Sequence, residues 1–466
     1  MGIQAYLEHL QQQYKLEPYP DLKRRLKLLD SLRAMLTENE SAITEAVCKD
    51  FGYRSPFETE LAEIYPSLKA ISHTKKQLSG WMESEKRGVS LWFKPARARI
   101  MYQPVGVVGI IVPWNYPLYL ALGPLVSALA AGNRVMLKVS EFTPQFSLLF
   151  TRLCEQYLGP DWVKVVYGGP DVGAEFSGLA FDHLLFTGSG EIGKKVMKAA
   201  SDNLTPVTLE LGGKSPTIID KSFPIKTATE RLLFGKLLNG GQTCLAPDYA
   251  FISNEDIDQF IEKAKKVAKK FYPEWENKGY TSLASNKQVE RYQYMLADAK
   301  AKGATIIPLW EADGASESHI KNGKATPLLI MDTTEDMQVR QQEIFGPMLP
   351  VVPYGDHQDV IRYINSQPRP LALYLFSNKQ SVIKNYMLNT ISGGVTLNDT
   401  ILHVSQEELP FGGIGASGMG QYHGVEGFKT FSKAKSIFKQ SRFAGTNLMY
   451  PPANKLSRLL LKLMKR

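Results

Sequence analysis

The sequence predicts an α/β protein with two doubly wound parallel-sheet domains and an additional β-hairpin segment. Strand-like and helix-like segments alternate along most of its 466 residues, as they do in parallel βαβ units. Residues 105–112 form a continuous apolar run, which is typical of a strand buried on both faces. The chain is also long enough, and at 44% hydrophobic residues apolar enough, to bury more than one core.

The first expected domain begins with two helices. Apolar residues recur at three- and four-residue spacing over residues 21–49, and a second helical pattern covers residues 58–83. An alternating strand at 97–104 then leads into the apolar run. Further strands are expected at 134–139, 163–166 and 183–186, and further helices at 145–157 and 193–201. This order indicates a parallel sheet.

The same alternation continues beyond residue 211 and predicts the second domain. Its strands are expected at 217–219, 249–252, 349–352 and 371–376, and its helices at 226–238 and 256–271. The two domains are expected to meet near residues 210–215, where two glycines allow the chain to change direction. Residues 94–102 and 431–442 alternate in polarity and are expected to form strands of a protruding hairpin.

The distribution of charge argues against a nucleic-acid role. Of the net charge of +9, five positive charges lie in the last twelve residues, which leaves +4 on the rest of the chain. Those basic residues are interspersed with acidic ones and form no aromatic and basic platform. The basic amphipathic tail at 455–466 is either a helix that rests on an anionic membrane surface, or a frayed terminus or a helix docked on a partner subunit.

Targeting and cysteine patterns favour the cytoplasm. The start of the chain lacks the basic and apolar regions of a secretory signal. The longest apolar stretch, at 105–131, is interrupted by prolines and glycines and therefore does not read as a membrane span. Three cysteines far apart in the sequence form no disulfide framework, which fits a reducing compartment.

Cys244 is the candidate nucleophile. It follows a turn with paired glycines at 239–243, and because glycines lack side chains, few side-chain atoms would surround a thiol there. Cys48 and Cys154 lie in amphipathic helical stretches and are expected to be small buried hydrophobic residues. The seven histidines show no spacing that suits zinc, so no metal site is expected.

A glycine-rich turn at 186–193 follows a strand and opens a helix. Gly188, Gly190 and Gly193 match the G-x-G-x-x-G pattern whose backbone N–H groups can face a phosphate, although such glycines also serve packing alone. Lys138 and Glu141 follow another strand and are either ribose-binding groups or a solvated charge pair. A carboxylate there would disfavour an extra 2′-phosphate.

Two further residues suit catalysis. Glu210 lies in an apolar strand, and burial of a carboxyl raises its pKa toward that of a useful general base; the alternative is a structural acid bonded to the backbone. Asn115 lies on a turn between Pro113 and Pro117, where its amide could stabilise an oxyanion or could simply be a turn residue.

Taken together, these motifs resemble the aldehyde dehydrogenase superfamily in order and spacing from about residue 50 to residue 431. The matching segments are 113–117, 186–189, 210–214, 241–244, 343–347, 410–413 and 417–418. The short N-terminus and the Gly188-Ser189 turn are similar to the class 3 branch. Segments 50–55 and 103–112 are most similar to bacterial coniferyl aldehyde dehydrogenases.

The resemblance implies a domain layout and a homodimer. A Rossmann-like NAD-binding domain would comprise residues 1–86 and 107–210, and the catalytic domain residues 211–395. Residues 87–106 and 425–445 would be oligomerisation segments, and 446–466 a basic tail. Membrane-bound class 3 members have a long apolar anchor, whereas this tail is short and basic, so any membrane contact would be peripheral.

The resemblance also implies roles for individual residues. Cys244 would attack the aldehyde, Asn115 and the backbone N–H of Cys244 would stabilise the oxyanion, and Glu210 would activate water. The cofactor, NAD with NADP as a second candidate, would contact Lys138 and Glu141 at the adenine ribose, Gly188, Ser189 and Gly193 at the pyrophosphate, and Glu343 and Phe345 at the nicotinamide ribose and ring. Glu343 would also be a candidate to share the base role.

The expected reaction is oxidation of an aldehyde, either aromatic such as coniferyl aldehyde or long-chain, to the carboxylic acid. Trp114, Tyr116, Tyr119 and Phe411 would form an aromatic funnel, unless they are ordinary core residues. One alternative is an enzyme that passes its thioester to coenzyme A, and Glu210 argues against it. The other is a catalytically silent, ligand-binding or membrane-associated relative.

Overall fold

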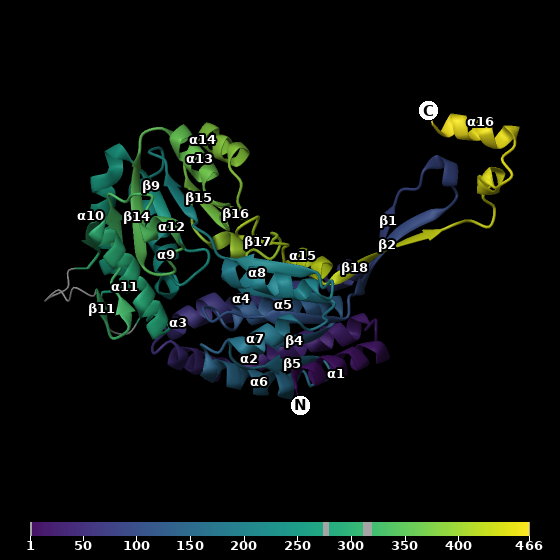
Figure 1. Ribbon diagram of the computed structural model, residues 1–466, viewed down its shortest axis with the longest axis horizontal. Helices are drawn as coiled ribbons and strands as arrows, with labels where there is room; N and C mark the ends of the chain where they lie inside the picture. Colours follow the sequence, from purple (N-terminus) through teal and green to yellow (C-terminus); the bar gives the residue numbers. More distant parts are fainter. Residues whose placement is uncertain (1, 274–278, 311–318, 466) are drawn as a thin grey trace.

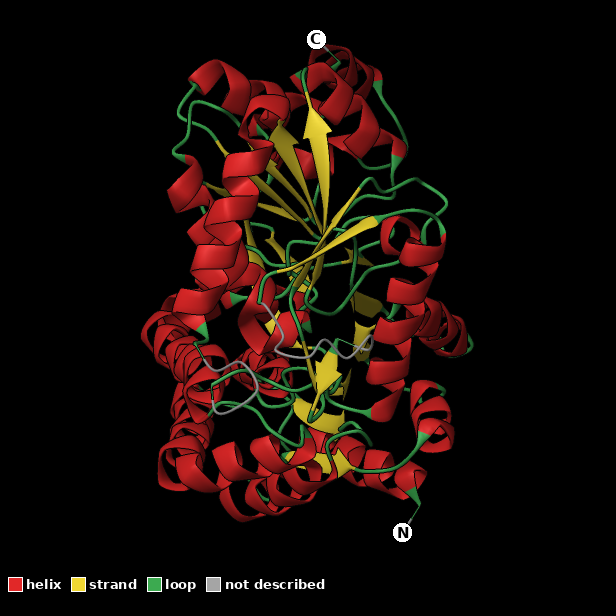
Figure 2. Cartoon of the chain, turned by 90° about the vertical axis from the view of Figure 1, so that its left-hand side faces the viewer, coloured by secondary structure: helices red, strands yellow, loops and turns green. Residues whose placement is uncertain are grey.

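The computed structural model describes residues 2–273, 279–310 and 319–465, and their arrangement is shown in Figure 1. These residues form a six-stranded sheet, a seven-stranded sheet, a three-stranded sheet and a small two-stranded sheet. Helices flank the two large sheets, and Figure 2 shows the strands of these sheets fanning out between the helices. The α/β class and the two largely parallel sheets predicted from the sequence are therefore confirmed.

The six-stranded sheet has the order β17-β7-β6-β3-β4-β5. Its strands are β3 (Val107–Ile111), β4 (Arg134–Lys138), β5 (Val163–Val166), β6 (His183–Gly188), β7 (Val207–Leu211) and β17 (Gly418–Met419). All pairings are parallel except that of β17 with β7. The sequence did not predict this short antiparallel edge strand.

Alternate residues of these strands face two separate cores. Val108 and Ile110 pack with helices α2 (Leu22–Asp50), α4 (Tyr65–Met82), α5 (Tyr119–Ala131) and α6 (Pro144–Tyr157). Val107 and Ile111 pack with helices α1 (Ile3–Leu16), α7 (Pro170–Ser177) and α8 (Gly190–Ser201) on the other face. Burial on both faces explains why this strand reads as continuously apolar.

Two of the boundaries that differ from expectation have a clear structural cause. The apolar strand begins at Val107 and not at residue 105, because Gly106 has a φ of +144° and a β-carbon there would lie 2.0 Å from the Asp182 carboxylate. The helical run at 58–83 comprises α3 (Pro56–Thr59), a π-helical turn η1 (Glu60–Ile64) and then α4. The π-helical turn therefore changes the direction in which the side chains of α4 point relative to those of α3.

The seven-stranded sheet has the order β10-β13-β14-β9-β8-β15-β16, with β10 antiparallel to the rest. Its strands are β8 (Pro216–Ile219), β9 (Tyr249–Ser253), β10 (Thr305–Pro308), β13 (Leu328–Met331), β14 (Met348–Tyr354), β15 (Ala372–Phe376) and β16 (Gly394–Leu397). The surrounding helices are α9 (Ile225–Leu237), α10 (Ile257–Phe271), α11 (Asn286–Ala301), α12 (Gln338–Gln341), α13 (His357–Ser366) and α14 (Gln380–Asn389). Helix α15 (Gly424–Thr430) instead packs on α4 and α5 of the other unit. The chain passes between the two large sheets at residues 212–215, where the glycines predicted a junction.

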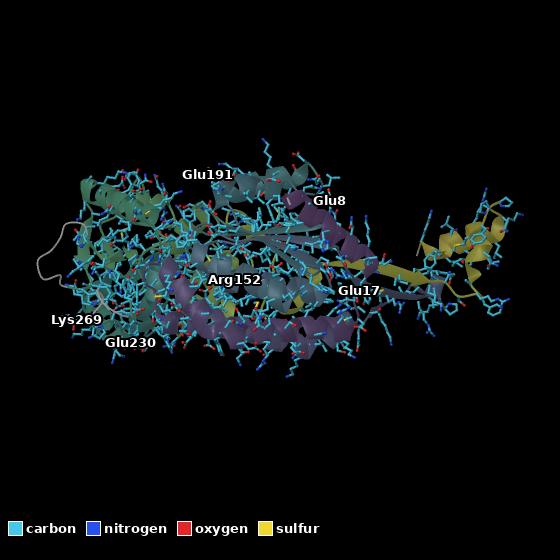
Figure 3. The ribbon with its side chains drawn as sticks, turned by 90° about the horizontal axis from the view of Figure 1, so that it is seen from below. Glu8, Glu17, Arg152, Glu191, Glu230 and Lys269 are labelled. Carbon is cyan, nitrogen blue, oxygen red and sulfur yellow. The ribbon has the colours of Figure 1, made fainter. Side chains whose placement is uncertain are left out.

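The third sheet projects from the body as an arm in Figure 1. It consists of β1 (Glu85–Arg87), β2 (Arg97–Pro104) and β18 (Ser432–Lys439), in that order. The two expected strands do pair, because β2 is antiparallel to β18 over eight residues. They are not a hairpin, however, since β1 and β2 are the strands that follow each other in sequence. In the body, charged side chains such as Glu8, Arg152 and Glu191 are exposed on the outer helices (Figure 3).

The tail lies at the tip of the arm in Figure 1 and forms helix α16 (Lys455–Met464), while Arg466 is outside the described residues. Asn454 and Ser457 form a capping box, so the helix has a defined start. Its leucines at 456, 459, 461 and 463 are exposed. Within the described ranges, no helix combines the length and apolarity that a membrane span requires.

Candidate active site

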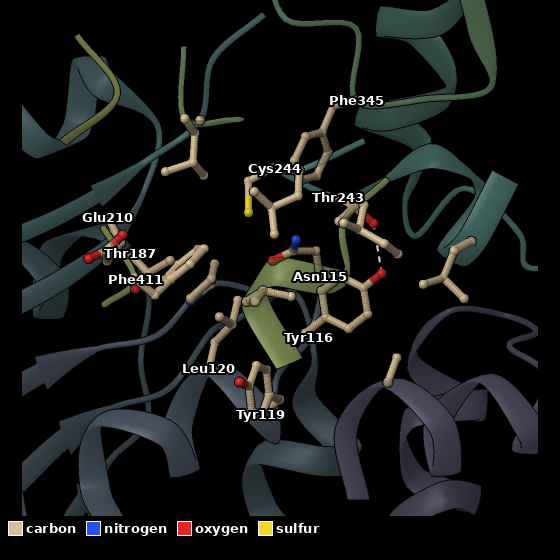
Figure 4. Close-up of a pocket in the computed structure, with 18 of the residues that line it drawn as sticks. Asn115, Tyr116, Tyr119, Leu120, Thr187, Glu210, Thr243, Cys244, Phe345 and Phe411 are labelled. Carbon is tan, nitrogen blue, oxygen red and sulfur yellow. Dashed lines mark hydrogen bonds between the residues drawn. The ribbon is translucent and has the colours of Figure 1, made fainter. Parts of the chain in front are cut away.

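A pocket of about 470 Å³ is lined by residues from both large units (Figure 4). Seven of the ten residues singled out in the sequence line it: Asn115, Gly188, Ser189, Glu210, Cys244, Glu343 and Phe345. Lys138, Glu141 and Gly193 do not. The carboxyl ends of β6 and β7 reach this pocket, as expected for a ligand site in an open α/β sheet.

Cys244 follows a turn with an unusual backbone. Asn239 and Gly240 have φ values of +55° and +60°, which place both residues in the left-handed region. Asn tolerates this conformation better than other residues with a β-carbon, and its side chain donates a 3.1 Å hydrogen bond to the backbone oxygen of Gln242. A β-carbon at Gly241 would lie 2.5 Å from the backbone oxygen of Gly346. These residues therefore determine where the thiol lies.

The Cys244 thiol reaches the pocket but is closely surrounded by protein. Burial, together with the nearby carboxyl groups of Glu343 and Glu210, raises the pKa of this thiol to about 12. Cys244 is therefore protonated at neutral pH, and a base must remove its proton before it can act as a nucleophile. Of the other cysteines, Cys154 is buried as expected, whereas Cys48 is partly exposed and so corrects the prediction.

Asn115 lies beside Cys244, and in Figure 4 its side-chain amide faces the same space as the sulfur. Its Nδ2 donates to the backbone oxygen of Gln242 at 3.2 Å, which leaves one amide N–H for a ligand. The next residue, Tyr116, has its hydroxyl 2.7 Å from Oγ1 of Thr243. The turn that carries Asn115 is thus tied directly to the turn that carries Cys244.

Two buried carboxyl groups border the pocket. Both side-chain oxygens of Glu210 lack a hydrogen-bond partner, and burial raises its pKa well above the ordinary value. Burial and the nearby Asp248 raise the pKa of Glu343 to about 8. The Glu343 carboxylate also lies over Gly212, where a β-carbon would come within 2.1 Å of Oε2. Glu343 keeps one oxygen, Oε1, without a hydrogen-bond partner. Buried carboxyl groups with free oxygens are suited to proton transfer.

The turn between β6 and α8 fits a phosphate-containing ligand. Ser189 caps α8 by accepting a 3.4 Å hydrogen bond from the backbone of Ile192. The hydroxyl of Thr187 is buried without a hydrogen-bond partner beside the pocket, and a β-carbon at Gly190 would meet open space. An open helix N-terminus, the unpartnered hydroxyl and the unpartnered Glu343 oxygen are compatible with a dinucleotide.

The remaining cofactor candidates lie outside the pocket. Lys138 is buried at the end of β4 and donates a 2.9 Å hydrogen bond to the partly exposed Glu141. Gly193 packs against the core, because a β-carbon there would lie 2.8 Å from the Leu211 side chain. Close packing of the helix against a strand is what the third glycine of a dinucleotide-binding turn provides, so this contact is compatible with the expected position near a pyrophosphate.

The pocket wall is largely apolar. Its lining includes the four aromatic residues that were expected to form a funnel, Trp114, Tyr116, Tyr119 and Phe411. His423 stacks on Phe411 with ring centroids 5.1 Å apart. The sequence did not single out Thr187 as a site residue, although the motif at 186–189 includes it. Nor did it single out Phe234, Leu238, Ile401 and Leu402, whose apolar residue types carry no signal of a binding role.

No group of histidine, cysteine and acidic side chains suited to a metal ion occurs among the residues that the structure describes. Among the polar groups that the pocket presents are a thiol, two carboxyl groups, an amide and a helix N-terminus.

Comparison with known proteins agrees with this chemistry. The model of the aldehyde dehydrogenase family matches residues 11–437. A probable coniferyl aldehyde dehydrogenase of Pseudomonas aeruginosa is 48% identical over 100% of this chain and 96% of its own. A coniferyl aldehyde dehydrogenase of a Pseudomonas species is 44% identical over 92% and 89%, respectively.

Among solved structures, the substrate-bound state of Staphylococcus aureus AldH superposes with a TM-score of 0.93 at 34% identity, covering 100% of this chain and 99% of that one. These findings confirm the resemblance stated from the motifs. The chain belongs to the aldehyde dehydrogenase family.

Proposed function

We propose that this aldehyde dehydrogenase forms a thiohemiacetal and then a thioester on Cys244, and releases a carboxylic acid by hydrolysis. The observation that carries the proposal is the convergence of Cys244, Asn115 and the unpartnered Glu210 carboxyl on one pocket. These groups supply a nucleophile, an oxyanion donor and a base.

Proton transfer has to begin the reaction, because the Cys244 thiol has a pKa of about 12. The buried carboxyl groups of Glu210 and Glu343 face the thiol, and because burial raises the pKa of each, either one can accept the thiol proton only after it has lost its own. The free amide N–H of Asn115 and the backbone N–H of Cys244 then stabilise the oxyanion that forms on the aldehyde oxygen. Glu210 finally removes a proton from the water that attacks the thioester.

NAD or NADP, when bound, supplies the acceptor for the aldehyde hydride. Gly188, Ser189 and the start of α8 would hold the pyrophosphate, and Glu343 with Phe345 would hold the nicotinamide end. Lys138 and Glu141 would contact the adenine ribose. We propose a preference for NAD, because Glu141 would repel the 2′-phosphate of NADP.

We propose an aromatic aldehyde such as coniferyl aldehyde as the substrate class, with long-chain aldehydes as the second candidate. The aromatic and aliphatic pocket wall supports both, and the names of the Pseudomonas relatives support the first. The test compares kcat/KM for coniferyl aldehyde, benzaldehyde and a long aliphatic aldehyde with each cofactor. A clear preference for the aliphatic substrate would reject the aromatic assignment.

Product analysis distinguishes the alternatives. Mass spectrometry of enzyme quenched during turnover is expected to find an acyl group on Cys244, and the product to be a free acid with or without coenzyme A. An acyl-coenzyme A product would indicate acyl transfer, and absence of NADH formation with every aldehyde would indicate a silent relative.

We further propose a cytoplasmic homodimer whose arm contributes to assembly. Helix α16, with its exposed leucines and basic residues, would rest on an anionic membrane surface or on the partner subunit. Light scattering of the full chain and of a chain ending before residue 446, each with and without anionic vesicles, separates these two roles.

A further inference from the structure

Arg54 is a buried cation close to the catalytic turn. Its side chain is fully buried between the rings of Phe51 and Tyr116, at 5.2 Å and 4.9 Å from their centroids. A single nitrogen atom, Nη1, donates to Oε1 of Glu63 at 2.6 Å and to the backbone oxygen of Asn115 at 3.3 Å. A charge buried this deeply is costly to desolvate, and a buried ion pair is weak evidence for a role in stability alone.

Glu63 contacts the other end of the same turn. Its Oε2 accepts hydrogen bonds from the backbone N–H groups of Leu118 at 2.7 Å and Tyr119 at 3.1 Å, where α5 begins. The Arg54–Glu63 ion pair therefore bonds to the turn both at Asn115 and three residues later. Hydrogen bonds at both ends of the turn that carries Asn115 limit its rotation as a rigid body.

The π-helical turn η1 explains how Glu63 reaches this position. In an α-helix of about 3.6 residues per turn, residues five apart point in different directions. In η1 the N–H of Tyr65 bonds to the oxygen of Glu60, five residues earlier, and Glu58 and Glu63 are both buried. The longer turn allows both carboxyl groups to face the interior.

Glu58 contacts the turn that carries the nucleophile. It accepts a 3.4 Å hydrogen bond from the backbone N–H of Asn239 and another from the hydroxyl of Thr281. Asn239 in turn donates from Nδ2 to the backbone oxygen of Asn115 at 3.0 Å. The segment from Arg54 to Glu63 thus bonds to both catalytic turns, while Leu61 and Ala62 within it line the pocket.

We propose that Arg54 is a positioning residue, whose ion pair with Glu63 orients the turn so that the Asn115 amide meets the oxyanion. This inference rests on the proposed function, because it assigns Arg54 to the thiohemiacetal step. Arg54 does not touch the reacting atoms and acts only through Asn115. A merely structural role would instead lower stability without dependence on Asn115.

A double-mutant cycle tests the inference in the full-length enzyme. Arg54→Met is expected to lower kcat by about tenfold to a hundredfold, since loss of one oxyanion donor costs about a hundredfold or more. In the Asn115→Ala background the same change is expected to add no further loss. Arg54→Lys, which keeps a charged donor, should recover part of kcat. NADH affinity, measured by fluorescence titration, should stay unchanged in all variants.

Two further variants keep the test decisive if Arg54→Met fails to fold. The pair Arg54→Met with Glu63→Gln removes both charges but keeps a side-chain oxygen that can accept from Leu118 and Tyr119, so it is expected to fold. The matched control is Arg134→Lys, a buried arginine over Trp162 at the opposite end of the sheet, which should keep wild-type kcat.

Full kcat in this uncharged pair, or additive losses in the cycle, would overturn the role of Arg54 while Cys244 still becomes acylated. Wild-type enzyme whose Cys244 is never acylated would overturn the proposed function itself, and the Arg54 inference with it.

Discussion

The hydroxyl of Tyr116 lies 2.7 Å from Oγ1 of Thr243, and this buried hydrogen bond joins the turn that carries Asn115 to the turn that carries Cys244. Tyr116 follows the amide and Thr243 precedes the thiol. Their bond therefore couples the positions of the two groups that act on the aldehyde carbonyl.

Tyr116→Phe is expected to lower the free energy of unfolding by about 1–3 kcal/mol, because it leaves the Thr243 hydroxyl buried without its partner. It should also lower kcat several-fold. Thr243→Val is the matched change on the other side, and urea unfolding of both singles and the double variant measures their coupling. Fully additive effects would show that the bond does not couple the two turns.

Cys244→Ala should abolish dehydrogenase turnover while NAD still binds, because the thiol is the only group expected to bond to the aldehyde carbon. Cys48→Ala, on α2, is the control and should retain activity. NADH absorbance measures turnover, and isothermal titration measures cofactor binding. Turnover that survives in Cys244→Ala would reject the nucleophile assignment.

Glu210→Gln should slow thioester hydrolysis more than the formation of NADH, because the amide cannot accept a proton from water. Stopped-flow measurements are expected to show a burst of NADH followed by a steady-state rate lower by about a hundredfold or more. An unchanged steady state would assign the base role to another group, with Glu343 as the first to test.

The raised pKa of Glu343 predicts a pH-dependent stability. The folded protein holds the proton of Glu343 up to about pH 8. The contribution of this proton to the free energy of unfolding is therefore complete below the ordinary pKa of 4.5 and is lost as the pH rises through about 8. Glu343→Gln removes this dependence. Urea unfolding should therefore show the variant gaining stability relative to wild type between about pH 5 and about pH 9. If the free energies of unfolding of the variant and the wild type differed by the same amount across this pH range, the raised pKa of Glu343 would be contradicted.

Glu141→Gln should raise kcat/KM for NADP relative to NAD, because it removes the charge that would repel a 2′-phosphate. Lys138, which donates to Glu141 at 2.9 Å, would then be free to bind that phosphate. Initial rates with both cofactors check this. An unchanged ratio would place the adenine ribose elsewhere.

Regular elements were predictable where local periodicity is strong. The leucine spacing of α2 and the apolar run of β3 report directly which faces are buried. Cys244, Glu210 and Asn115 could be selected because each is a reactive or polar type in an unusual local setting. Their meeting in one pocket depends on chain crossovers that local patterns do not encode.

The rest required tertiary information. Nothing near Arg54 indicates that it contacts Asn115, 61 residues later. The π-helical turn differs from an α-helix by a single backbone shift, and its residues show no distinct pattern. Gly193 fits a phosphate motif in sequence, and its contact with the Leu211 side chain could be found only from the structure.

The edge of the arm has a consequence for the solubility of the protein. In the described structure β18 is an outer strand, and Lys433, Lys435 and Lys439 along it are exposed. Strands at an open edge can recruit other chains into fibrils, and lysines oppose this through mutual repulsion. The arm can thus extend from the body without promoting aggregation through its open edge. Replacing these lysines by threonine should make concentrated solutions of the protein turbid.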